Sequence, residues 1–244
     1  MNKLKTVVQY ECSTSFKYIW IFYGIELLVV ALISAVVFVS TGSMDHVGSN
    51  ALEVNTLIYF CVLGVLGYKE DFKMLIQNGF TRKYIYLGTI AMFSFISAVM
   101  ALVDTLFGRG MHQLSANYFS MFGALYGYDQ MILFNFLWLF LLYMCFGSLL
   151  YLVVLVIHKV ERIVAVCGGI TLGLVVILVL PVVFRFVLPQ AFTEAFIKAI
   201  LKGAGFMADG TVNLLYPLAA LAILAVLFNL VSYRVIQRTE LVTV

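Results

Sequence analysis

Three ionisable side chains, Glu26, Asp104 and Arg185, stand inside or at the ends of long apolar runs of this sequence. A charged group within a bilayer is costly, so each of the three is a candidate for function. Glu26 is the costliest because it lies well inside its run, and it could contact a neighbouring helix, a second copy of the chain or a substrate route. Asp104 and Arg185 lie near the ends of runs, where snorkelling or mutual pairing is expected.

Other patterns that would indicate chemistry are missing from the sequence. No GxxxxGK[ST] phosphate loop occurs, and Ser148 does not lie in the GxSxG turn of a hydrolase. His46, His112 and His158 have no second histidine or acidic residue at the spacing of metal ligands. We therefore expect no catalytic activity, no resident metal and no cofactor in this chain.

The composition shows what kind of protein must position these side chains. Of the 244 residues, 64% are apolar and 11% are charged, whereas ordinary globular domains have roughly 45–50% apolar and about 25% charged residues. Such a chain cannot cover a water-facing particle with polar groups. We predict an all-α integral membrane protein with a single transmembrane domain over residues 1–244, and a net charge of +3 gives no indication of nucleic acid binding.

Six apolar stretches are long enough to cross about 30 Å of hydrocarbon as helices. The predicted spans cover residues 18–39, 51–67, 84–107, 131–157, 163–184 and 214–233. The second is the weakest of the six because Glu53 and Asn55 lie in its first turns.

The distribution of lysine and arginine predicts the orientation of these spans. Eleven basic residues precede the first span, follow the last one, or lie in the connections 68–83 and 158–162. The opposite side holds only Arg109, Arg185, Lys198 and Lys202. Both termini are therefore predicted to be cytoplasmic.

Two further helices are expected outside the spans. Residues 1–17 have apolar side chains at near-helical spacing with lysines off that stripe, which predicts a helix lying in the inner membrane interface. Residues 189–212, on the outer side, repeat this pattern with Glu194 four residues before Lys198, and Gly203 ends it. The aromatic-rich outer loop 108–130 suits the headgroup region and predicts little else.

The inner connection 68–83, YKEDFKMLIQNGFTRK, predicts a short amphipathic helix at about 69–79. Phe72, Leu75 and Ile76 lie at positions i, i+3 and i+4, and Gly79 supplies a stop where φ can be positive. Thr81 then suits an N-cap of the third span. A basic loop that only attaches to the membrane is the alternative, but such a loop needs neither an apolar stripe nor a glycine stop.

Small residues suggest close helix contacts in two spans. Gly169 and Gly173 form a GxxxG pair in the fifth span, and Ala31 and Ala35 have the same spacing in the first. Packing within one bundle explains these pairs as well as dimerisation does.

This layout resembles the permease subunit of an ATP-binding cassette (ABC) type 2 exporter. The resemblance rests on an interfacial N-terminal helix, six spans with both ends inside, an amphipathic helix before the third span and outer helices before the sixth. Its most specific part is LIQNGFTRKYIYLG, residues 75–88, which is similar to the coupling helix and third-span entry of that family.

The resemblance implies two permeases, identical or similar, bound to two copies of a separate cytoplasmic ATPase that carries ATP and Mg. Phe72, Leu75 and Ile76 would be apolar anchors in a groove of that ATPase, with charged residues steering the contact. The expected coupling residues are Lys69, Glu70, Asp71, Phe72, Lys73, Leu75, Ile76, Asn78, Gly79, Arg82 and Lys83. Spans one and five, which carry the small-residue pairs, would form the permease dimer interface.

The expected cargo is amphipathic or hydrophobic, because the spans offer no charged lane to a hydrophilic ion. An antimicrobial peptide such as a bacteriocin, a drug and a lipid-linked molecule all fit. The resemblance further implies a multi-pass protein of a bacterial cell membrane and is compatible with a Gram-positive bacterium.

Two other functions stay open on the sequence alone. A substrate-capturing subunit of an energy-coupling importer would also span about six times, but it binds a small metabolite by itself and needs no amphipathic inner helix. A purely structural membrane scaffold is the second alternative.

Overall fold

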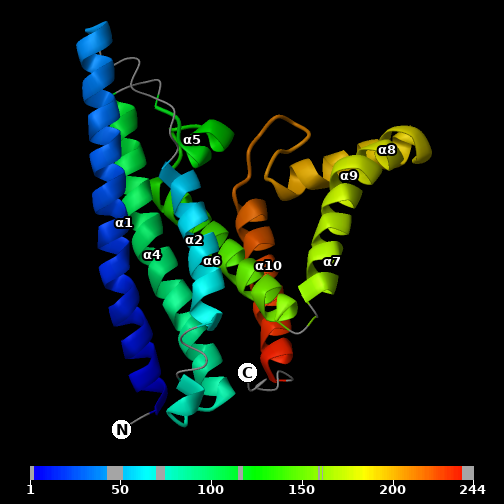
Figure 1. Cartoon of the computed structure of the whole chain (residues 1–244). Coiled ribbons are helices and arrows are strands. Elements are labelled where there is room, and N and C mark those ends of the chain that lie inside the picture. Colours follow the sequence, from blue (N-terminus) through cyan, green and yellow to red (C-terminus); the bar gives the residue numbers. More distant parts are fainter. Residues whose placement is uncertain are drawn as a thin grey trace.

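The computed structural model describes residues 3–42, 52–69, 75–114, 118–158, 160 and 162–237. These residues form helices joined by short connections and contain no strand beyond one isolated bridge between Phe206 and Val212. The elements, labelled in Figure 1, are α1 (Lys3–Thr41), α2 (Leu52–Lys69), α4 (Arg82–Leu114), α5 (Met121–Tyr126), α6 (Ile132–Ile157), α7 (Arg162–Leu174), η1 (Val175–Val179), α8 (Leu180–Val182), η2 (Val183–Val187), α9 (Gln190–Gly203) and α10 (Leu215–Gln237).

Helix length and composition identify an all-α, multi-pass membrane protein. Five helical stretches are long and apolar enough to cross a membrane: Leu4–Thr41, Arg82–Gln113, Ile132–Ile157, Ile163–Phe186 and Leu215–Gln237. The apolar part of α2 is shorter, Leu52–Gly64, and this is the stretch that the sequence marks as the weakest span.

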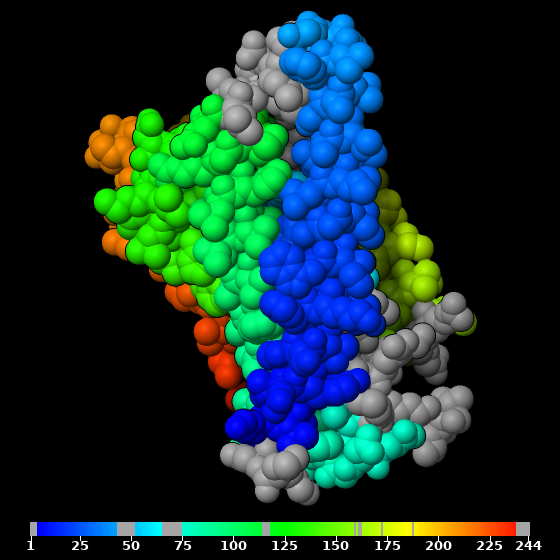
Figure 2. Space-filling view, turned by 90° about the vertical axis from the view of Figure 1, so that its left-hand side faces the viewer, coloured from blue at the N-terminus to red at the C-terminus, as the bar shows by residue number. Residues whose placement is uncertain are grey.

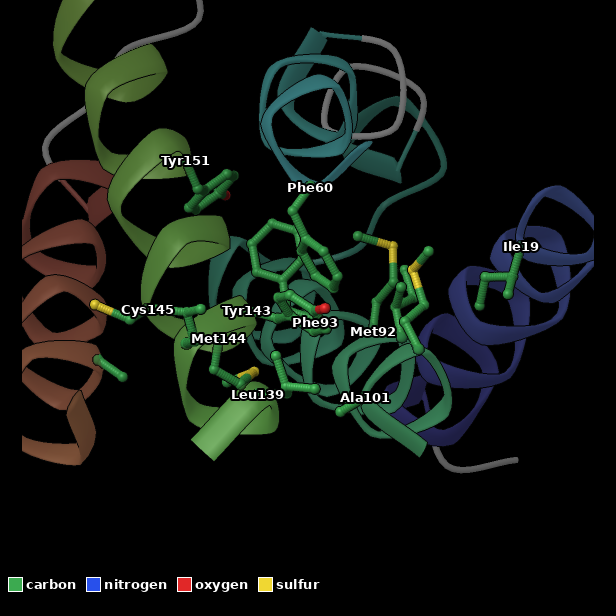
Figure 3. Packing of buried hydrophobic residues seen from close by; sticks show 14 of the residues in the cluster. Ile19, Phe60, Met92, Phe93, Ala101, Leu139, Tyr143, Met144, Cys145 and Tyr151 are labelled. Carbon is green, nitrogen blue, oxygen red and sulfur yellow. The ribbon is translucent and has the colours of Figure 1, made fainter. Parts of the chain in front are cut away.

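Helix α6 is the centre of the main bundle and packs against α2, α4 and α10, while α1 lies on the outer side of α4. Phe60, Phe93 and Tyr143 meet in the middle of this core (Figure 3), where the rings of Phe60 and Tyr143 stack with centroids 5.3 Å apart. Glycines allow the close approach of α2 and α6: a Cβ at Gly64 would lie 3.0 Å from the Leu150 Cβ atom.

The prediction of a separate interfacial helix over residues 1–17 is wrong for the described residues. Lys3–Thr41 is one continuous helix of 39 residues, and Figure 2 shows it lying along α4. Val7 and Ile19 are both buried, with exposed fractions of 1% and 0%. The apolar stripe of the N-terminal segment therefore faces α4 instead of lipid headgroups, and no proline separates the segment from the first span.

Two more differences from the sequence-based predictions concern the connection after the third predicted span and the fifth span. Helix α4 continues past the predicted end at residue 107, and α5 forms between α4 and α6, where the Ser120 hydroxyl accepts a hydrogen bond from the Gly123 N–H at 3.0 Å. The predicted fifth span contains two π-helical turns, η1 and η2, on either side of Pro181. Proline has no N–H to donate, which accounts for the irregular helix there.

Figure 1 shows α7 to α9 projecting from the side of the bundle next to α10. Within the apolar window of Ile163–Phe186, none of the residues whose burial the structure describes is buried. Figure 1 also shows that α1 begins and α10 ends at the same end of the bundle, and the Arg82 Nη1 atom there donates to the Gln237 carbonyl oxygen at 3.0 Å. This end is called the terminal end below.

Candidate functional site

The turn that precedes α4 is the first candidate site, and it stands at the terminal end of the bundle. Gly79 has a φ of +76°, and two hydrogen bonds close the turn, from the Gly79 N–H to the Ile76 carbonyl at 2.9 Å and from the Phe80 N–H to the Leu75 carbonyl at 3.1 Å. This is the αL glycine stop predicted from the sequence. Thr81 directly precedes α4, and its carbonyl accepts from the N–H groups of Tyr84 and Ile85.

Leu75, one of the three apolar anchors expected from the sequence, is buried in this structure. Its side chain is 4% exposed and belongs to the core of the chain itself, and Ile76 and Phe80 pack against that core. The stripe therefore holds the turn to its own bundle because the bundle supplies the apolar surface that the stripe needs. Phe72 and its charged neighbours Glu70, Asp71 and Lys73 lie outside the described residues, as does the side chain of Lys69.

The side chains that the turn does present are polar. Gln77, Asn78, Thr81 and Lys83 are exposed, Arg82 is half-buried, and Gly79 is exposed between them. We call residues 77–83 the exposed tip. A partner that binds this tip would contact amides, hydroxyls and cations instead of a leucine and an isoleucine.

The tip continues into α4 without a flexible linker, and α4 is attached to α10 at the same level. The Tyr86 hydroxyl donates a short hydrogen bond to the Asn229 carbonyl, and the Tyr86 and Tyr233 rings lie 5.0 Å apart. Together with the bond from Arg82 to Gln237, these contacts attach the start of α4 to the end of α10 beside the tip.

An apolar groove of about 590 Å³ begins beside the tip and runs between α4, α6 and α10. Lys83 lines its end, and the remaining wall consists mainly of aliphatic and aromatic side chains such as Tyr86, Phe140 and Met144. A groove of this kind suits an acyl chain or another apolar molecule at membrane depth.

The second candidate site is a buried polar cluster around Asp104, whose exposed fraction is 1%. The Tyr23 hydroxyl donates to one carboxylate oxygen at 2.7 Å and the Tyr143 hydroxyl to the other at 2.5 Å. Both distances are typical of hydrogen bonds from a hydroxyl to a charged carboxylate. Asp104 thereby connects α4 to α1 and α6 in the interior.

Glu26 and Glu53 lie around the same cluster. Glu26 accepts a hydrogen bond at 2.9 Å from the Asn55 amide on α2, and Glu53 is 1% exposed near α5. Among the described residues, no group of three His, Cys, Asp or Glu side chains could hold a metal ion. Next to Glu53, burial and then the Glu53 carboxylate raise the pKa of the Tyr118 hydroxyl, so that hydroxyl keeps its proton.

Sequence analysis identified Glu26 and Asp104 as polar candidates but missed their proximity and the third carboxylate, Glu53. The available signal was the presence of Glu53 and Asn55 within an apolar run. Asp104 was expected to snorkel or to pair with Arg185, and in the described residues it does neither. It is 1% exposed and accepts hydrogen bonds from two tyrosines. Arg185 is exposed in η2, with its guanidinium carbon 5.6 Å from the centroid of the Phe186 ring.

The small-residue pairs lie on surfaces without intrachain packing. Ala31 and Ala35 are exposed on α1, and on α7 Gly169 is exposed and Gly173 is half-buried. A Cβ added at either glycine would meet nothing within 4 Å. Packing within the bundle therefore does not explain the glycine pair in the described part of the chain. These surfaces face either lipid or another protein.

The predicted outer helix is present as α9, and it ends at Gly203 as expected. Glu194 and Lys198 form the expected i,i+4 ion pair at 3.8 Å. The apolar stripe of α9 stays exposed and comprises Phe192, Phe196, Ile197, Ile200 and Leu201.

Comparison of the chain with protein-family models, with curated proteins and with solved structures gave no match.

Proposed function

We propose that this chain is the transmembrane permease subunit of an ABC type 2 exporter in a bacterial cell membrane. The observation that carries the proposal is the exposed tip, residues 77–83, closed by Gly79 and joined directly to α4 at the terminal end of the bundle. A tip of this kind suits the transfer of a mechanical push, because no flexible segment lies between it and a long helix.

Helix α4 provides the path for such a push. Its 33 residues correspond to a length of about 50 Å at 1.5 Å per residue, and Asp104 lies about 33 Å along it by the same rise. At that level Tyr23 and Tyr143 attach α4 to α1 and α6. Movement of the tip would thus reach the opposite half of the bundle as a rigid-body displacement.

The proposed assembly has two permeases, identical or similar, and two ATPases that bind ATP and Mg. The exposed small residues on α1 and α7 supply surfaces for the second permease, and the tip faces the ATPase in the cytoplasm. We propose an amphipathic or hydrophobic cargo, such as an antimicrobial peptide, a drug or a lipid-linked molecule, because the groove between α4, α6 and α10 is apolar.

The test is purification of the full chain from its own host in mild detergent, followed by identification of bound proteins and measurement of ATP hydrolysis. We expect an ABC ATPase in equal molar amount. Gln77→Asp together with Lys83→Glu should reduce its recovery by about tenfold, a loss that corresponds to roughly 1.4 kcal/mol. The matched control is Lys198→Glu on α9, which reverses an exposed charge far along the chain from the tip.

A chain that is recovered intact without any ATPase would refute the proposal. Tight binding of a small metabolite by the isolated chain, with a different membrane protein as its partner, would identify it as the capturing subunit of an importer. Unchanged ATPase recovery with the tip variant would show that the coupling contact lies elsewhere.

A further inference from the structure

A second groove lies on the surface between α1 and α2, away from the tip. Its volume is about 220 Å³, and its lining residues are Phe22, Ile25, Glu26, Val29, Val30 and Asn55. Ile25 and Val29 are 62% and 46% exposed, so the groove opens toward the membrane. Apart from Glu26 and Asn55, every lining side chain is apolar.

Glu26 lines this groove with a carboxylate, and one of its two oxygens has no hydrogen-bond donor among the described residues. The side chain is 7% exposed, and one of its oxygens accepts from the Asn55 amide at 2.9 Å. The other oxygen, Oε2, is buried and has no hydrogen-bond donor in the part of the chain that the structure describes. Among the described residues, no lysine, arginine or histidine lies within ion-pair distance of it. A buried carboxylate oxygen without a donor costs free energy that a cation with N–H groups would recover.

The surroundings strengthen the preference for a cation. Asp104 and Glu53 lie close enough to act electrostatically on Glu26, and both carry the same sign. Asp104 is already satisfied by Tyr23 and Tyr143. Glu53 also has an oxygen without a donor, but Glu53 is 1% exposed and does not line the groove. Glu26 is therefore the carboxylate of the cluster that faces the open space of the groove.

We propose that the groove between α1 and α2 binds the ammonium head of an amphiphile, with Glu26 as the counter-ion and the apolar walls against the first part of its chain. A volume of about 220 Å³ holds about seven groups of the size of water, enough for the head and a few methylenes. The rest of the chain extends into the bilayer. An anionic head would be repelled, and a neutral head would supply a weaker hydrogen bond.

The groove between α4, α6 and α10 is the natural comparison within the same molecule. It is also apolar, but Lys83 lines it and no acidic side chain does. It should not select an ammonium head. Binding of an ammonium head at Glu26 does not depend on the proposed transport function. That the transported cargo is itself a cationic amphiphile would follow only if the chain is also the proposed exporter.

The test uses the full chain in vesicles of phosphatidylcholine with three photoreactive probes of one chain length: a dodecylamine, a dodecanol and a dodecanoate, each with a diazirine near the head. Labelled peptides are identified by mass spectrometry, and affinities come from competition with the unlabelled compounds. We expect the amine to label α1 and α2 around Phe22 and Val29 and to bind about tenfold more tightly than the alcohol, as expected for one charge-assisted contact.

Two variants separate the charge from the shape of the groove. Glu26→Gln should reduce the affinity for the amine to that for the alcohol, while Val29→Trp should block labelling by filling the groove with Glu26 intact. Glu194→Gln, which removes an exposed carboxylate on α9, should change nothing. A thermal melt of each variant shows that it is folded, and Val29→Trp tests the site even if Glu26→Gln does not fold.

Equal binding of amine and alcohol, persistence of amine binding in Glu26→Gln, or labelling confined to α4, α6 and α10 would overturn the proposal. Vesicles with added phosphatidylethanolamine distinguish the sources of the head group: loss of labelling assigns the site to a membrane lipid, and unchanged labelling to a free amine. Recovery of the ATPase is a separate measurement, so the site and the exporter function fail independently.

Discussion

Asp104 is the residue on which the interior of the bundle depends most. It accepts one hydrogen bond from Tyr23 on α1 and one from Tyr143 on α6. Asp104→Ala would leave the Tyr143 hydroxyl buried without its acceptor. The Tyr23 hydroxyl would lose its 2.7 Å acceptor and keep the longer contact to the Met100 carbonyl at 3.2 Å. Each buried polar group that loses its partner costs about 1–3 kcal/mol, so we expect the free energy of unfolding to fall by about 2–4 kcal/mol. Thermal unfolding in detergent measures this loss.

Two variants that each remove a single donor accompany that prediction. Tyr23→Phe and Tyr143→Phe each leave one carboxylate oxygen of Asp104 without its donor, so each should cost about 1–3 kcal/mol. Asp209→Ala, at an exposed turn where the carboxylate accepts only from Thr211, should leave the melting temperature nearly unchanged. If Asp104→Ala has the same melting temperature as the wild-type chain, the carboxylate does not hold these helices together.

Gly79 has a conformational role that its surroundings allow to be tested cleanly. Its φ is +76°, and a Cβ added there would meet nothing within 4 Å. Gly79→Ala therefore changes backbone strain alone, with an expected cost of about 1–2 kcal/mol. Gly110→Ala in α4 also meets no atom but has an ordinary helical backbone, so it should be neutral or stabilising by up to about 1 kcal/mol.

The measurement for this glycine pair is thermal unfolding together with ATPase recovery. Gly79→Ala should lower both, because a distorted stop redirects the exposed tip. Equal effects of Gly79→Ala and Gly110→Ala would mean that the stop has no special role.

At the scale of elements, the contact between α1 and α4 depends on a glycine. A Cβ at Gly88 would lie 2.6 Å from a Val7 methyl group, and Val7 is buried. Gly88→Ala should therefore destabilise the chain by about 1–3 kcal/mol. Val7→Ala in the same chain removes the clashing methyl group, so the double variant should recover part of the loss.

This prediction also tests the course of the N-terminal segment. Gly24→Ala, in α1 with nothing within 4 Å of the added atom, is the matched control and should be tolerated. If residues 3–17 lay in the plane of the membrane, Gly88→Ala would be tolerated too, and Val7→Ala would show no rescue.

Most helices could be predicted from the sequence because each apolar run is a local signal. The predicted span 131–157 and the observed α6, Ile132–Ile157, differ by one residue, and Gly203 ends α9 as expected. The surface against which an apolar stripe packs cannot be predicted from the local sequence. Residues 1–17 and Leu75 carry stripes that suit a headgroup layer or an ATPase groove, yet both stripes pack against the bundle of the same chain.

The polar cluster shows the same limit at the candidate site. Glu26, Asn55 and Asp104 stand out in the sequence because each interrupts or borders an apolar run. Their grouping depends on how α1, α2 and α4 are aligned along one another. The sequence of a single apolar run does not determine this alignment. The tyrosines are less visible still, because a tyrosine in a membrane helix is ordinary and only its position opposite Asp104 gives it a role.

The molecule as a whole consists of a packed helical bundle and a segment, α7 to α9, that projects from it. Helices α4, α6 and α10 share packing contacts, whereas the apolar window of Ile163–Phe186 is unburied. A span with no intrachain burial has only lipid or another protein to contact. Close approach of two backbones at Gly169 and Gly173 needs no side chain to move, which favours a helix as the neighbour.

We therefore expect two copies of the chain to meet along α1 and α7. In a variant without the four native cysteines, Gly173→Cys and Ala35→Cys should each form disulfide-linked dimers in membranes under mild oxidation. Ile223→Cys is the control, because Ile223 is 60% exposed on α10 but lies outside the proposed interface. Cross-linking at Ile223 equal to that at Gly173 would indicate random collision, and its absence at both Gly173 and Ala35 would leave lipid as the neighbour of these helices.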